Sequence, residues 1–217
     1  MKKILLLGML ILFVVVTTST VLYARQMKSE MSPKMVISKS SVELRVTMRK
    51  LWEDHITYTR NYIISALANL EDVSKVAGRL LKNQDDIGDA IKPIYGDEAG
   101  KKLAMLLRDH IMIATEVVKA AKMGNNEELS KANKKWYANG DDIAAFLSSA
   151  NPNWSKKALQ DMLYKHLEYT TQEVVSRLKK DWSSDIEAYD KGHVHMLMFA
   201  DVLTDGIVKQ FPDKFMK

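Results

Sequence analysis

The stretch that decides the fold is Leu51-Trp52-Glu53-Asp54-His55-Ile56, which recurs in similar form at residues 106–111 and 162–167. The histidines of the three stretches, His55, His110 and His166, are spaced by 55 and 56 residues. Apolar residues lie three and four positions before each histidine, which places them on the same face of a helix. We therefore expect each imidazole to be at least partly buried, in a helical unit that is used three times.

A proline closes each unit, at Pro93, Pro152 and Pro212. No stretch after residue 41 alternates polar and apolar residues with a period of two, so strands are not expected. The sequence predicts an all-α fold, a bundle of six helices built from three repeated helical hairpins. The hairpins are expected at residues 42–93, 97–152 and 155–212.

Length and composition suit one compact domain with an N-terminal extension. The chain has 217 residues, of which 47% are hydrophobic, so it can bury a core without disulfides. It contains no cysteine, which excludes disulfide bonds and thiolate metal sites. The net charge of +5 resides in residues 1–40, because residues 41–217 contain 26 basic and 26 acidic residues. A folded domain without excess positive charge is not typical of a nucleic-acid-binding protein.

The N-terminus has the pattern of an export signal. Lys2-Lys3 precede an apolar run from Ile4 to Val16, and the apolar character continues to Ala24. Cleavage after Ala24 would place the large Leu22 where a small residue is preferred, so we predict an uncleaved signal-anchor over residues 1–24. Residues 25–41 then form a polar tether to the domain, 42–217. The protein is expected in the cytoplasmic membrane as a single-pass protein with its domain outside; secretion after cleavage is the alternative.

The histidines need hydrogen-bond partners if they are buried. Aspartates on the second helix of each hairpin are the expected partners: Asp86, Asp142 and Asp201. His193 lies eight residues before Asp201 and shares its face, whereas His195 lies about 200° around the helix from His193. Glu173, seven residues after His166, lies on the face of that histidine. The candidate site is therefore His55, His110, His166, His193, Asp86, Asp142, Asp201 and Glu173.

Several readings of this His/Asp cluster stay open. It is either a set of structural hydrogen bonds, a site for a divalent metal such as iron, zinc or manganese, or a site for a small polar ligand or a catalytic proton shuttle. Copper is a lesser alternative, raised by the histidines and methionines of residues 193–198. The Glu-x-x-His pairs of di-iron bundles, the His-Glu-x-x-His zinc motif and phosphate-binding glycine loops are all missing from the sequence.

Several motifs resemble those of a family of small exported or membrane-anchored prokaryotic all-helical proteins. They lie at residues 51–60, 83–93, 136–139, 151–154, 188–193 and 206–212. The resemblance implies a helical, exported domain over residues 48–212, and it implies no particular reaction. It also favours His55, His110, His166 and His193 as a set, of which His55 and His193 lie within these motifs.

We therefore expect a membrane-anchored extracytoplasmic helical bundle that binds or senses a ligand, with a His/Asp cluster that holds a metal or a small polar ligand. The alternatives are a metal-dependent enzyme of unknown reaction and a purely structural envelope protein. Expected partners are the membrane, through the N-terminal helix, and a protein of the envelope; nucleic acid is not expected. No catalytic motif is recognised.

Overall fold

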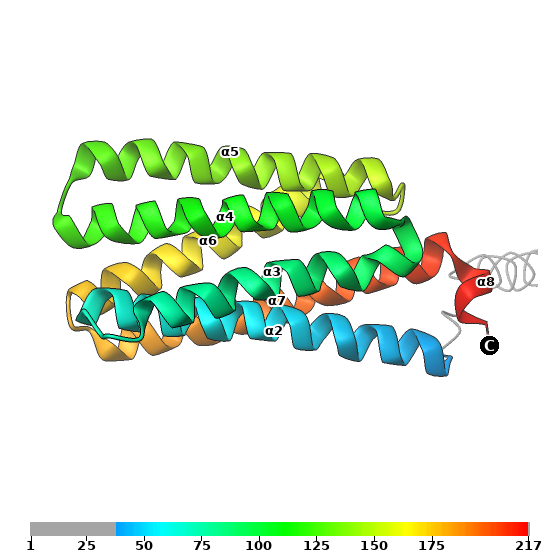
Figure 1. Ribbon diagram of the computed structural model, residues 1–217, viewed down its shortest axis with the longest axis horizontal. Helices are drawn as coiled ribbons and strands as arrows, with labels where there is room; N and C mark the ends of the chain where they lie inside the picture. The colour runs from blue at the N-terminus through cyan, green and yellow to red at the C-terminus, as the bar shows by residue number, and fades with distance from the viewer. Residues whose placement is uncertain (1–37, 217) are drawn as a thin grey trace, which may run out of the picture. The chain divides into compact units, whose positions relative to one another are not determined.

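The computed structural model describes residues 38–216, which form α-helices joined by short turns (Figure 1). The long helices are α2 (Lys39–Ala68), α3 (Val73–Tyr95), α4 (Asp97–Met123), α5 (Asn126–Ala150), α6 (Lys156–Leu178) and α7 (Trp182–Gln210), and the short α8 (Pro212–Phe215) follows. No strand occurs in this part of the chain, so the predicted all-α fold is confirmed. The predicted signal-anchor, residues 1–24, lies outside the described residues. Among the helices of residues 38–216, none combines the length and the apolarity needed to cross a bilayer.

The long helices form a bundle around one main core. Each packs against the next in the sequence, and α7 returns to pack against α2 (Figure 1). In the interior, α4 also contacts α2 and α6. The core is apolar and aromatic; Trp52 of α2 meets Phe199 of α7 edge to face, with ring centroids 5.0 Å apart. Elements distant in the sequence therefore lie side by side, which is what brings the histidines of different helices together.

The first helix begins earlier than the sequence pattern predicts. It starts at Lys39 rather than Val42, because Ser38 and Ser41 form a capping box in which each side chain accepts the backbone N–H of the other. A Ser38 cap of this kind typically stabilises a helix by about 1 kcal/mol. The last residues of the predicted tether are thus helical.

Two glycines let α3 and α4 approach closely. A Cβ atom added to Gly88 would lie 2.5 Å from the carbonyl oxygen of Gly100 and 2.7 Å from the Cβ of Ala104. Neither the backbone nor a Cβ in a helix can move aside cheaply, so only glycine fits at residue 88. This close contact fixes α4, the helix that carries His110, against α3.

Candidate functional site

Three buried imidazoles from three different helices meet inside the bundle. His55 of α2, His110 of α4 and His166 of α6 are 2%, 3% and 2% exposed, which confirms the predicted burial. The ring of His166 lies between the other two, with its centroid 5.4 Å from that of His55 and 6.0 Å from that of His110. We call these three residues the histidine core.

Amides, not aspartates, are the partners of two of these histidines. Nδ1 of His55 lies 3.3 Å from Oε1 of Gln84, and Nδ1 of His110 lies 2.7 Å from Oδ1 of Asn139. The amide nitrogens of Gln84 and Asn139 donate to the carbonyls of Leu80 and Leu106, so their oxygens must act as acceptors. Each histidine therefore carries its proton on Nδ1, and its Nε2 is left with a free lone pair.

The predicted hydrogen bonds between histidines and aspartates are wrong. Asp86 pairs with Lys82 on its own helix, and Asp201 accepts from Arg45 and Arg49. A carboxylate beside neutral imidazoles would lose its hydration with no opposite charge to compensate, whereas an amide can be buried at a lower cost.

The remaining predicted residues also lie outside the histidine core. Asp142 is exposed and makes no hydrogen bond or ion pair with another described side chain. His193 lies near the surface, where its Nε2 is 3.3 Å from Oε1 of Glu53. The expectation that His193 rather than His195 would point inward is therefore not met.

A further hydrogen bond is shared by the helix pairs α2–α3, α4–α5 and α6–α7. In each pair it runs from a side chain of the later helix to a backbone carbonyl of the earlier one. Asn139 donates to the carbonyl of Leu106, four residues before His110, and in the same way His195 Nε2 donates to the carbonyl of Met162, four residues before His166. The side-chain amide of Asn83 likewise donates to the carbonyl of Leu51, four residues before His55. The sequence holds a signal for these partners, because Gln84, Asn139 and His195 each follow their histidine by 29 residues.

His166 differs from the other two histidines in its hydrogen bonding. Its Nδ1 is buried and has no partner among residues 38–216. The residue at the position of Gln84 and Asn139 is His195, whose Nε2 is already used by the carbonyl of Met162. A buried nitrogen without a partner costs about 1–3 kcal/mol, so this arrangement is the least satisfied of the three.

All three histidines of the core are neutral near pH 7. Burial lowers the pKa of His55 to about 3, with a smaller effect from His110, and lowers the pKa of His110 to about 4. Burial, assisted by the neighbouring imidazoles, also holds the pKa of His166 well below its ordinary value. Neutral imidazole is the form that can bind a metal ion.

Glu173 is buried as predicted, but it belongs to a separate charged cluster. Its carboxylate, 5% exposed, accepts a 2.8 Å hydrogen bond from Arg60. Asp185, 1% exposed, bridges Arg60 and Arg177. Burial raises the pKa of Glu173 to about 7, although Arg60 opposes that shift. Asp185 was not expected to be buried, because an aspartate in the first turn of a helix is usually exposed at the helix N-terminus.

Space for a ligand near the histidine core is small. An enclosed cavity of about 20 Å³ lies beside Thr59 and Thr170, each four residues after a core histidine, and beside Trp136, whose ring is tilted by 38° against that of His110 at 5.4 Å. That volume suits about one water molecule, since a water needs roughly 10–15 Å³ measured in this way. No substrate of ordinary size can reach the imidazoles in this state.

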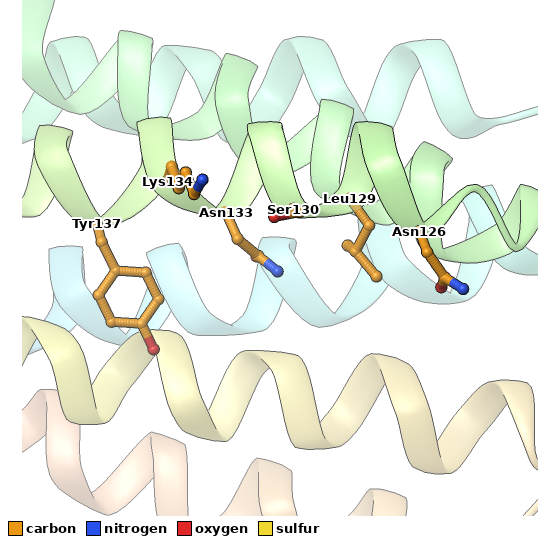
Figure 2. Close-up of a pocket in the computed structure, with 6 residues that line it drawn as sticks. All are labelled: Asn126, Leu129, Ser130, Asn133, Lys134 and Tyr137. Atoms are coloured by element: carbon orange, nitrogen blue, oxygen red, sulfur yellow. The ribbon is translucent and has the colours of Figure 1, made fainter.

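The surface offers a larger but shallower hollow, of about 450 Å³, along α5. Figure 2 shows the side chains of Leu129, Asn133 and Tyr137 leaving α5 on the same side. A single helix supplies all its lining residues, and they include no carboxylate or histidine. This hollow therefore lacks the paired acid and base that most catalysis needs.

Within residues 38–216, no three histidine, aspartate or glutamate side chains are grouped closely enough to hold a metal ion as they stand. Comparison of the chain with protein-family models, curated proteins and solved structures found no significant match.

Proposed function

We propose that the protein is a membrane-anchored, extracytoplasmic helical module that binds or senses a ligand and catalyses no reaction. The observation that carries this proposal is the meeting of three neutral, buried imidazoles from α2, α4 and α6 in a core that is closed to substrates. An enzyme would need an open cleft beside its reacting groups. A binding role needs only an ion or a water-sized ligand to reach the core.

The domain is, in this proposal, three copies of one helical hairpin: α2–α3, α4–α5 and α6–α7. Two observations support it: the spacing of the histidines by 55 and 56 residues, and the donation of a hydrogen bond from the second helix to the carbonyl four residues before each histidine. A duplicated hairpin explains why polar residues recur at core positions, since a copied unit retains its buried hydrogen bonds.

The membrane anchor and the outward orientation rest on the sequence of residues 1–24. Lys2-Lys3 and the long apolar run after them are typical of a signal-anchor. A protein of this kind would present its bundle to ligands or to protein partners of the envelope.

A purely structural role is the second candidate. It is favoured by the amide partners of His55 and His110, which satisfy Nδ1 of both rings without any ligand. In that case the histidine core would serve to fix the register of the helices, as buried polar groups do in some helical assemblies.

The full-length chain, purified in detergent without a metal-affinity tag, separates these candidates. Elemental analysis would be combined with melting curves before and after chelation. Bound metal at one equivalent, with a chelator-induced fall in melting temperature, is expected of a metal-binding module. No metal and no shift would favour the structural role. Protease digestion of intact cells, followed by detection of the bundle, tests its external location.

A further inference from the structure

The α6–α7 helix pair departs from α2–α3 and α4–α5 at one position, the residue that lies 29 positions after the buried histidine. Gln84 and Asn139 place an amide oxygen against Nδ1 of His55 and His110. His195 occupies the corresponding position 29 residues after His166. It makes the same hydrogen bond to the first helix that Asn139 makes, but it leaves Nδ1 of His166 without a partner among the described residues.

The hydrogen bond of His195 fixes its protonation. The Met162 carbonyl can only accept, so Nε2 of His195 must carry the proton, and the lone pair is on Nδ1. Met162 lies one turn before His166 on α6, so this hydrogen bond holds the ring of His195 against the part of α6 that carries His166. Two imidazole nitrogens thus remain available at one contact between α6 and α7, one buried and one on a half-buried residue.

We propose that His166 and His195 are the two protein ligands of a binding site for a single transition-metal cation. The inference rests on the binding role proposed above and deepens it by naming the position and the ligand. With two protein ligands, the remaining coordination positions would belong to water or to a small anion. This fits the finding that no group of three ligands is already assembled in residues 38–216.

Imidazole nitrogen suits copper, zinc and nickel, and affinity for such a site is greatest for Cu²⁺. The donation from His195 Nε2 to a backbone carbonyl is the kind of outer contact that orients histidine ligands in metal sites. The half-buried His195, whose ring lies 5.9 Å from that of Tyr169, gives the cation a way in from the surface.

The test is titration of the full-length chain in detergent with Cu²⁺ and with Zn²⁺, by calorimetry and, for Cu²⁺, by electron paramagnetic resonance. The unmodified protein is expected to bind one Cu²⁺ with two imidazole nitrogens and to bind Zn²⁺ more weakly. The variant His195→Asn should lose at least about 10-fold in Cu²⁺ affinity, since even changes to outer contacts typically cost 10–100-fold. His193→Asn is the matched control, because His193 lies two residues away and outside the histidine core.

The His195→Asn variant has a second readout that does not need metal. Asparagine restores the arrangement of Asn139, so its oxygen can pair with Nδ1 of His166, and the metal-free variant should melt at a higher temperature than the unmodified protein. This shows that the variant is folded when its loss of Cu²⁺ binding is measured.

Three outcomes would overturn the proposal: no saturable Cu²⁺ binding by the unmodified protein, equal affinity in His195→Asn, or an equal loss in His193→Asn. After any of these outcomes, the ligand-binding role proposed above would still hold if the purified protein carries a different small ligand. Failure of that role would instead appear as a protein that carries no ligand and responds to none.

Discussion

Acid should weaken this fold through its neutral histidines. The unfolded chain takes up protons on His55 and His110 below about pH 6.5, whereas the folded chain does so only near the lowered pKa values of about 3 and 4, respectively. Between these limits the unfolded state binds more protons, so the free energy of unfolding falls as the pH falls. From pH 7.5 to pH 5 each of the two histidines contributes a loss of about 2 kcal/mol.

Glu173 acts in the opposite direction. Its folded pKa of about 7 lies above the ordinary value of 4.5, so over the same range the folded state binds more protons. The expected gain is about 2.5 kcal/mol, against a combined loss of about 4 kcal/mol from the two histidines. Since His166 is shifted in the same direction as the other histidines, the net change from pH 7.5 to pH 5 should be a loss of about 1.5–3.5 kcal/mol.

Urea unfolding followed by circular dichroism at a series of pH values would measure this change. In the variant Glu173→Gln, which retains a partner for Arg60, the loss of stability over this pH range should be greater by about 2.5 kcal/mol because the opposing group is gone. A stability that is flat from pH 7.5 to pH 5 in both proteins would refute the reasoning. It would mean that the imidazoles are solvated or already charged in the folded state.

Two further predictions concern packing. Replacement of His110 by alanine should destabilise the fold by about 3 kcal/mol or more, because it leaves a cavity and a buried Asn139 oxygen without a donor; a loss below about 0.5 kcal/mol in urea unfolding would contradict the buried position. Gly88→Ala should destabilise the fold by at least about 2 kcal/mol, because the new Cβ would collide with the carbonyl oxygen of Gly100. Gly78 lies in the same helix, and a Cβ added there would have no neighbouring atom within 4 Å. Gly78→Ala should therefore stabilise the fold by about 0.5–1 kcal/mol. Equal effects of the two glycine substitutions on the melting temperature would show that α3 and α4 are not in close contact.

The sequence by itself determined the helices and the burial of His55, His110 and His166. Both follow from local periodicity, because steps of three and four residues place the histidines on the faces that carry leucine, methionine and tryptophan. The proposed threefold use of one hairpin would also explain the meeting of the three rings, since equal spacing in a repeated unit puts equivalent residues at similar depths in a bundle.

Only the tertiary structure decided which polar groups meet the histidines. Asp86 lies two residues after Gln84, which is about 200° around the helix, so only one of the two can face His55, and the local spacing does not decide which one. The same ambiguity separates His193 from His195 on α7. Local spacing does not fix how far a helix is rotated against its neighbour. That rotation is set by close contacts such as Gly88 against Gly100, and by the cost of burying a carboxylate where an amide can be satisfied.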